Sequence, residues 1–154
     1  SKHPAAKNVL FNIEMKSDPR VPKAQPEPAD FAKLVTDVII KNKMQKRAIL
    51  QSFDHRTLIA AHKIAPGITR AALFESRPND PVKATQDAKS SIFSPYHKWL
   101  TEDDVQTLQE NGIKVIPWTA NDEKTWENLL VLQVDGIITD DPKALIEYIK
   151  KRGL

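Results

Sequence analysis

The chain has 154 residues, 40% of them apolar and 28% charged, a composition that can bury a core and is unlike that of disordered chains. Its formal net charge is +3 and its Lys and Arg residues are dispersed, which argues against nucleic acid as a partner. It has no cysteine, which excludes disulfides, and no apolar run approaches the roughly 20 residues of a transmembrane helix. We expect a soluble protein, with a cytoplasmic and a periplasmic or secreted location both left open.

Six short segments rich in Val, Ile, Leu or Phe are predicted to be strands. They are Val9–Met15, Ala48–Phe53, Arg70–Phe74, Ser91–Ser94, Ile113–Trp118 and Val134–Thr139. Six helices are predicted between and after them: Asp30–Lys43, Arg56–Ile64, Val82–Ala88, Glu102–Asn111, Glu123–Leu130 and Pro142–Lys151. This alternation predicts six βα units and a parallel sheet, either doubly wound or closed into a barrel. The stretch Ser17–Pro28 is predicted to be a loop on the active face.

Capping residues support the predicted helix ends. Thr101 stands before an acidic first turn, Asp141 stands before a proline, and Asp54 can cap the helix that begins near Arg56. Gly112 follows the helix Glu102–Asn111, where a left-handed residue commonly ends a helix.

The strand Val9–Met15 carries charge at its carboxyl end. Residues two apart on a strand point to the same side, which separates an apolar set that is expected to pack against helices from a second set that becomes polar. The apolar set is Val9, Phe11, Ile13 and Met15, and the second set is Leu10, Asn12, Glu14 and Lys16. Because α/β enzymes place their sites at the carboxyl ends of strands, Glu14 is a candidate metal ligand and Lys16 a candidate partner for an anion. A Glu14–Lys16 ion pair with a purely structural role is the alternative.

Further segments follow in a specific order: Gln51-Ser52-Phe53-Asp54, Phe93-Ser94-Pro95, Val115-Ile116-Pro117-Trp118-Thr119-Ala120-Asn121 and Val134-Asp135-Gly136-Ile137-Ile138-Thr139-Asp140-Asp141-Pro142. Together with Phe11–Lys16, they closely resemble the glycerophosphodiester phosphodiesterase family over nearly the whole chain. The resemblance implies an α/β fold, an incomplete TIM (β/α)8 barrel. Six βα units would be present and the first two strands missing, so residues 1–154 would be the carboxyl-terminal part of one domain.

The resemblance also implies an activity, the metal-dependent hydrolysis of glycerophosphodiesters to glycerol 3-phosphate and an alcohol, with Ca²⁺ or Mg²⁺ as the cofactor. Glu14 matches the family's metal-binding glutamate, Lys16 its phosphate-stabilising lysine and Trp118 its aromatic residue at the substrate-side mouth. Gln51, Phe53 and Asn121 are further candidates for the mouth. Asn121, with Thr139 and Asp140, is expected to support the top of the barrel.

The sequence departs from the family in its acid–base residues. The family's His-Arg pair, Pro-Glu-Asn-Thr segment, Glu-x-Asp pair and His-Asp pair do not occur here, so we expect no catalytic residue in this chain and no activity from it alone. The four histidines lack the flanking family motifs; they are His3, His55, His62 and His97. The first residue, Ser1, is not Met, which suggests a processed chain or a fragment.

Two other functions are compatible with the sequence. One is a non-enzymatic half-barrel that binds anions or assembles with another chain, and the other is a lipid-directed barrel of the phospholipase type. A barrel that lacks two strands has open edges, which predicts a dimer or association with a missing N-terminal segment. The alcohol head group and the identity of the metal are left open.

Overall fold

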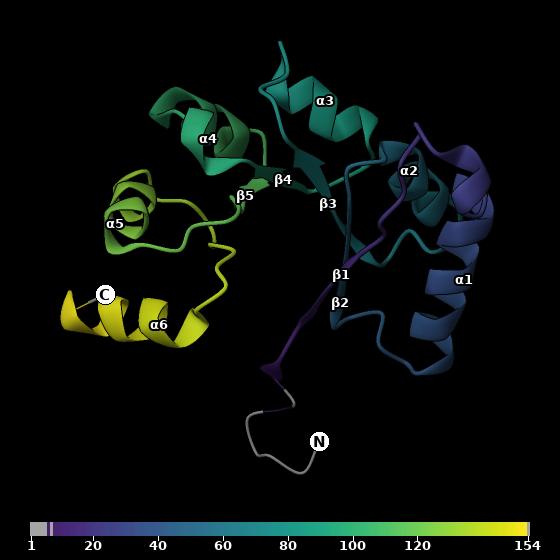
Figure 1. Cartoon of the computed structure of the whole chain (residues 1–154), viewed down its shortest axis with the longest axis horizontal. Coiled ribbons are helices and arrows are strands. Elements are labelled where there is room, and N and C mark those ends of the chain that lie inside the picture. The colour runs from purple at the N-terminus through teal and green to yellow at the C-terminus, as the bar shows by residue number, and fades with distance from the viewer. Residues whose placement is uncertain (1–5, 7, 154) are drawn as a thin grey trace. The chain divides into compact units, whose positions relative to one another are not determined.

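The computed structural model describes residue 6 and residues 8–153, so His3 lies outside the described residues. Its strands form a parallel sheet in chain order: β1 (Phe11–Glu14), β2 (Ala48–Ser52), β3 (Thr69–Phe74), β4 (Ile92–Pro95) and β5 (Lys114–Val115). The helices are α1 (Pro28–Lys41), α2 (His55–Ile64), α3 (Pro81–Asp87), α4 (Glu102–Glu110), α5 (Glu123–Val131) and α6 (Pro142–Lys151) (Figure 1). None of these helices is long and apolar enough to cross a membrane.

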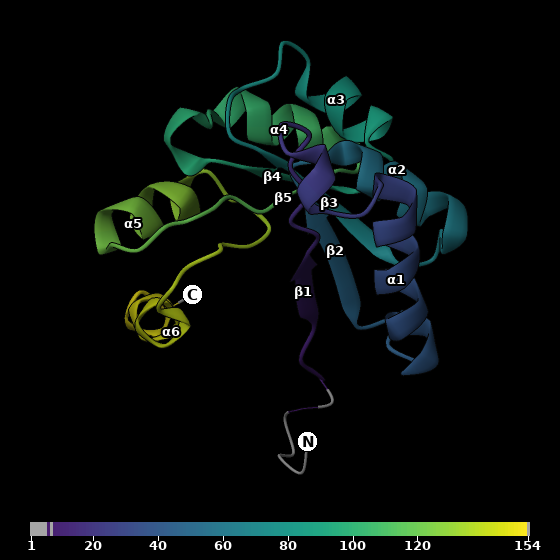
Figure 2. The ribbon, with the colours of Figure 1, turned by 45° about the vertical axis from the view of Figure 1, so that its right-hand side comes forward.

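The chain divides into two compact units, residues 1–72 with 86–91 and residues 73–85 with 92–154. In the first unit, β1 pairs with β2 in parallel, from Phe11 opposite Ala48 to Glu14 opposite Gln51. Helices α1 and α2 lie on the same side of these two strands (Figure 2). Leu50 and Leu58 are fully buried on that side, so the core of this unit lies between the strand pair and the two helices.

The predicted apolar set of the first strand is only partly buried. Met15 is buried, as expected, but Val9 and Phe11 are 49% and 44% exposed, so the prediction that they pack against helices is wrong. The guanidinium of Arg47 lies 5.3 Å from the centroid of the Phe11 ring and donates to the carbonyl oxygen of Val9. A cation from the turn before β2 therefore covers the beginning of β1, where a helix was expected.

In the second unit, β4 pairs with β5 in parallel, and Phe93 lies opposite Val115. The ring of Phe93 is fully buried, with its centroid 4.6 Å from that of Phe74. The indole of Trp126, on α5, is buried as well and donates a hydrogen bond to the carbonyl oxygen of Ala120. Large aromatic side chains thus form much of the core of this unit.

The predicted helices are all present, with ends within two residues of those expected. The carboxylates of Asp54 and Asp141 and the hydroxyl of Thr101 accept hydrogen bonds from backbone N–H groups of the helices that they precede, as predicted. Gly112 has a φ of +71°, which confirms the left-handed residue expected after α4.

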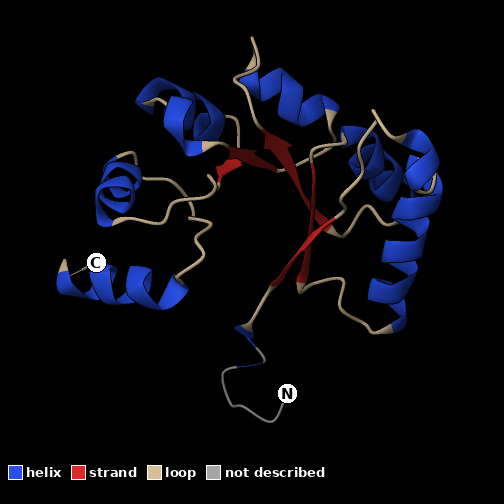
Figure 3. Ribbon diagram, in the orientation of Figure 1, coloured by secondary structure: helices blue, strands red, loops and turns tan. Residues whose placement is uncertain are grey.

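The sixth predicted strand is not a strand. Residues 134–139 form an extended loop between α5 and α6 (Figure 3). The backbone N–H groups of Asp135 and Ile138 donate to the carbonyl oxygens of Val115 and Pro117. Successive donors in a regular parallel ladder are two residues apart, whereas these are three apart, so one extra residue breaks the ladder. The N–H of Val115 bonds to the Asp135 carboxylate, which takes the place of a backbone acceptor.

Candidate functional site

The candidate residues of the first unit share the face of the β1–β2 pair that points away from α1 and α2. On the helix side, Met15, Leu50 and Ser52 are buried. Because side chains alternate along a strand, Glu14 and Gln51, which are opposite each other in the register, point to the other face. The amide nitrogen of Asn12 donates to the Gln51 side-chain oxygen over 2.7 Å, which shows that these polar side chains meet across the two strands.

Glu14 and Lys16 form an ion pair at the carboxyl end of β1. The Lys16 ammonium lies 3.1 Å from a carboxylate oxygen of Glu14, and the side chains are 81% and 24% exposed, respectively. A pair between so exposed a lysine and its neighbour contributes little to stability, about 0–1 kcal/mol. The lysine can therefore exchange its partner for an anion from solution at small cost. Phe53, another candidate, follows β2 and is 46% exposed.

Trp118 lies in the second unit, three residues after β5. Its indole N–H donates to the carbonyl oxygen of Ser94 over 2.9 Å, and its ring centroid is 5.4 Å from that of Tyr96. The backbone also joins the two aromatic residues, which form an isolated parallel bridge. The Trp118 ring is half-buried, and both the hydrogen bond of its indole N–H and its contact with the Tyr96 ring fix its position.

The side chain of Asn121 forms hydrogen bonds with residues of its own unit, Thr139 and Asp140. Its amide nitrogen donates to the Asp140 carboxylate over 2.6 Å, and its amide oxygen accepts from the backbone N–H of Asp140 and the Thr139 hydroxyl. These bonds tie the end of the loop at residues 134–139 to the segment after Trp118. They agree with a supporting role for Asn121, although its place at a substrate mouth stays a prediction.

Among the histidines that the structure describes, none lies in a cluster with acidic residues: no group of three or more His, Asp or Glu side chains could hold a metal ion there. His97 follows β4 and lines a pocket with Asp122 and Lys124. Burial lowers the pKa of His97, and the charge of Lys98 lowers it further, although Asp122 acts in the opposite direction. The residues around His97 do not indicate a role for it in a reaction.

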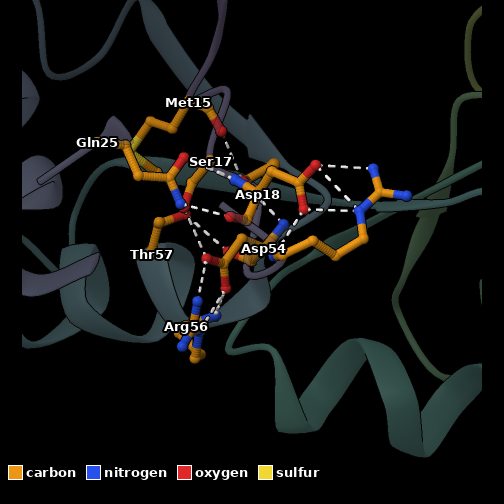
Figure 4. Close-up of polar contacts among 9 residues, drawn as sticks. Met15, Ser17, Asp18, Gln25, Asp54, Arg56 and Thr57 are labelled. Carbon is orange, nitrogen blue, oxygen red and sulfur yellow. Dashed lines mark hydrogen bonds and ion pairs between the residues drawn. The ribbon is translucent and has the colours of Figure 1, made fainter. Parts of the chain in front are cut away.

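One buried network beside Glu14 and Lys16 was not predicted from the sequence. Asp54 was expected only to cap α2, but its carboxylate also accepts a hydrogen bond of 2.7 Å from the hydroxyl of Ser17, 37 residues earlier (Figure 4). No local pattern signals a bond over this separation in the chain, because each residue taken alone is typical of a turn or a cap.

Parallel strands with polar side chains at their carboxyl ends place the chain in the α/β class of proteins that bind ligands at that edge. Three comparisons narrow the class. A model of the glycerophosphoryl diester phosphodiesterase family matches residues 2–144. A glycerophosphodiester phosphodiesterase of Caldanaerobacter subterraneus subsp. tengcongensis is 30% identical over 147 residues, 96% of this chain and 58% of that relative. The chain belongs to the glycerophosphoryl diester phosphodiesterase family.

Solved structures show the same fold. A crystal structure of a Silicibacter pomeroyi protein, assigned to the glycerophosphoryl diester phosphodiesterases, matches with a TM-score of 0.86 and 24% identity over 94% of this chain and 52% of that one. A phosphodiesterase of Oleispira antarctica, solved with the product sn-glycerol-3-phosphate, matches with a TM-score of 0.80 and 18% identity over 92% of this chain and 55% of that one. The chain therefore spans little more than half the length of these relatives.

Proposed function

We propose that this chain contributes the phosphate-binding part of a site that hydrolyses glycerophosphodiesters to glycerol 3-phosphate and an alcohol. The observation that carries the proposal is the exposed ammonium of Lys16 beside Glu14, at the carboxyl end of β1. Family membership and the product bound by the Oleispira antarctica phosphodiesterase support this substrate class.

Lys16 suits a phosphodiester because a lysine ammonium is a compact positive charge with three donors and a flexible stem. A phosphodiester anion carries its charge on two oxygens, and this charge grows when a nucleophile attacks phosphorus. An ammonium placed beside these oxygens stabilises the transition state more than the ground state, which accelerates hydrolysis. In the second unit, Trp118 presents a fixed aromatic surface of its own, and its contact with a substrate stays a prediction.

Glu14 is proposed as one oxygen ligand of a divalent ion, Ca²⁺ or Mg²⁺, which when bound would neutralise phosphoryl charge. The described residues do not complete such a site, because no three acidic or histidine side chains cluster among them and Ca²⁺ takes six to eight oxygen ligands. We therefore assign no step of the reaction to a metal held by these residues.

We assign the acid–base chemistry to none of the described residues. Hydrolysis needs a group that takes a proton from the nucleophile and a group that protonates the leaving alkoxide. His97, which follows β4, shares its pocket with one acidic residue, Asp122, and no described histidine belongs to a group of three or more His, Asp or Glu side chains that could hold a metal ion. We propose that the chain by itself binds the product but does not turn over the substrate.

The exposed Lys16 ammonium also fits a second candidate function, a module that binds anions without catalysis. Both functions predict that sn-glycerol 3-phosphate binds weakly and that Lys16→Met weakens binding by about tenfold, because one charge-assisted hydrogen bond is lost. Lys33→Met, which removes an exposed, ion-paired lysine on α1, is the matched control and should leave the affinity unchanged. The measurement is a titration of the ¹⁵N-labelled chain followed by amide chemical shifts.

A hydrolysis assay separates the candidates. Glycerophosphocholine and a lysophospholipid are offered to the purified chain with and without Ca²⁺, and we expect no product from either. If the chain hydrolyses glycerophosphocholine and Lys16→Met abolishes this activity, the chain is itself an enzyme and contains the acid–base residues that the reaction needs. Turnover of the lysophospholipid alone would favour a lipid-directed barrel. Product binding that Lys16→Met does not change would refute the proposed phosphate contact.

The outer edge of β1 is proposed as the place where the chain associates with a second copy. In the sheet of the described residues, β1 has β2 as its one neighbour, and the N–H groups of Phe11 and Met15 point to the side of β2. The backbone groups of Asn12 and Glu14 consequently face the open edge, where a further strand can pair with them. A monodisperse monomer in light scattering at high protein concentration would rule this association out.

A further inference from the structure

Buried hydrogen bonds join the two neighbours of Lys16 to the end of β2 and to Asp54, the residue before α2 (Figure 4). The Ser17 hydroxyl donates to the Asp54 carboxylate over 2.7 Å, and the Ser52 hydroxyl donates to the carbonyl oxygen of Met15, also over 2.7 Å. Ser17, Ser52 and Asp54 are all buried, so water does not compete for these bonds. Lys16 therefore stands on a backbone that is fixed on both sides, although its own side chain reaches into solvent.

Asp54 keeps its negative charge in this buried position. Arg56 donates to it from the backbone N–H and from the guanidinium, over distances of 2.8 to 3.2 Å. The guanidinium hydrogen bonds hold the pKa of Asp54 below its ordinary value, against burial, which would raise it, and the bond from Ser17 lowers it further. An ionised acceptor makes the bond from Ser17 shorter and stronger than a bond to a neutral group.

The loop beyond Ser17 is braced as well. The backbone N–H of Asp18 donates to the side-chain oxygen of Gln25 over 2.8 Å, and the Gln25 amide nitrogen donates back to the carbonyl oxygen of Asp18 over 2.6 Å. Arg20 forms an ion pair with the Asp18 carboxylate and holds its pKa down, at about 2. These bonds hold the loop that follows β1 at Asp18 and Gln25 (Figure 4).

We propose that Asp54 is a positioning residue for anion binding, which acts through Ser17 to fix the backbone that presents Lys16 beside Glu14. The inference rests on the proposed function, since it assigns Asp54 a task at the same site. A lysine that is 81% exposed keeps much of its rotamer freedom, so the fixed backbone is what confines its ammonium. Releasing the backbone adds to the ordering that binding requires, and the affinity for the anion falls.

Asp54 also caps α2, and a cap alone would account for a buried aspartate. The two roles are separable because Ser17 takes no part in the cap. Ser17→Ala removes the bond to the loop after β1 and leaves the bonds from Arg56 to Asp54 in place. Asp54→Asn is the second variant, since asparagine caps helices equally well. Its single side-chain oxygen is then used at the Arg56 N–H, so its amide nitrogen faces Ser17 and the charge-assisted bond is replaced by, at most, a neutral bond in which the Ser17 hydroxyl accepts.

A matched control exists in the second unit. The Thr101 hydroxyl donates to the Asp104 carboxylate over 2.8 Å, and this carboxylate is buried and paired with an arginine, as Asp54 is. Thr101→Ala removes the same type of bond, together with the cap of α4, at a place that is not adjacent in the chain to Lys16. It should lower the melting temperature and leave the affinity for anions unchanged.

The experiment is a titration of each full-length variant with sn-glycerol 3-phosphate, combined with ¹⁵N relaxation of the Lys16 amide. We expect Ser17→Ala to weaken binding by about two- to tenfold and to increase the motion of that amide, with Asp54→Asn giving a smaller effect of the same kind. In the Lys16→Met background, Ser17→Ala should have no further effect on affinity, because the group that it positions is gone.

The outcomes also separate this inference from the proposed function. If Lys16→Met weakens binding but Ser17→Ala changes no more than Thr101→Ala does, the phosphate contact stands and Asp54 is only a cap. If Ser17→Ala weakens binding equally with and without Lys16, it does not act through that lysine, and the inference is wrong. If the unmodified chain does not bind the product, the proposed function fails and the positioning role fails with it.

Discussion

The buried ion pair between Arg77 and Asp104 should contribute far more to stability than an exposed pair of similar length. Two guanidinium nitrogens of Arg77 donate to the Asp104 carboxylate, over 2.6 and 3.2 Å, and the Asp104 side chain is 3% exposed. Lys33 and Asp37, one helical turn apart on α1, are 2.5 Å apart but 64% and 54% exposed. The two ion pairs are therefore similar in length, but only the Arg77–Asp104 pair has a buried carboxylate.

Replacing Arg77 with methionine leaves the carboxylate of Asp104 buried with only the donors of Thr101. A hydrogen bond to a charged group contributes about 1.5–3 kcal/mol, and the second bond of Arg77 is long, so we expect a loss of about 2 kcal/mol. This stays below the 3–5 kcal/mol of a fully buried pair, because Arg77 itself is 52% exposed and water can partly replace it. For a chain of this size the melting temperature should fall by roughly 4–8 °C. Lys33→Met should cost about 0.5 kcal/mol or less.

The pH dependence tests the electrostatic origin of this difference. Burial alone would raise the pKa of Asp104, but the hydrogen bonds from Arg77 and Thr101 bring it below its ordinary value. A carboxyl group with a lowered folded-state pKa contributes stability above its unfolded value, near 4, and loses it as the pH falls through the folded value. Urea denaturation at pH 7 and pH 3 should therefore show a smaller effect of Arg77→Met at pH 3. Equal losses for Arg77→Met and Lys33→Met at pH 7 would refute the reasoning.

Three further variants test the core and one helix end. Leu58→Ala, at a fully buried position on α2, should cost about 2–5 kcal/mol in urea denaturation, because it leaves a cavity. Trp126→Phe should cost about 1–3 kcal/mol, because the buried carbonyl oxygen of Ala120 loses its donor; a change below 0.5 kcal/mol would show that water replaces the indole. Gly112→Ala should lower the stability by about 1 kcal/mol, since the φ of Gly112 is +71°, whereas Gly67→Ala, at an open position without positive φ, is its neutral control in thermal melts.

The helices were predictable because their ends are coded locally. Thr101 and Asp104 form a capping box within four residues, and Asp141 is followed directly by the proline that begins α6. The strand at residues 134–139 was not predictable in the same way. Its composition is that of a buried strand, but the Asp135 carboxylate replaces a backbone acceptor in the ladder, and side-chain bonds of this kind are not visible in a pattern of apolar residues.

Strand alternation predicted in which direction the candidate site residues point, but it did not predict which residues contact them. Alternation alone places Glu14 and Lys16 on one face of β1, and the structure bears this placement out through their ion pair. The environment of Val9 and Phe11 did not follow from alternation, because Arg47, which lies over the Phe11 ring and donates to the Val9 carbonyl oxygen, belongs to another element. Alternation along a strand predicts the side to which a side chain points, but not which residues lie on that side.

The hydrogen bond between Ser17 and Asp54 could not be predicted without the register of β1 with β2. The register of β1 and β2 places Glu14 opposite Gln51 at the end of β1, and Ser17 and Asp54, each three residues further along the chain, are joined by their hydrogen bond. A shift of the register by two residues would keep every side chain on its face, and so keep the same apolar pattern, yet it would remove this bond. Hydrophobic periodicity therefore fixes the faces of the site, while the pairing of β1 with β2 decides which buried carboxylate supports Lys16.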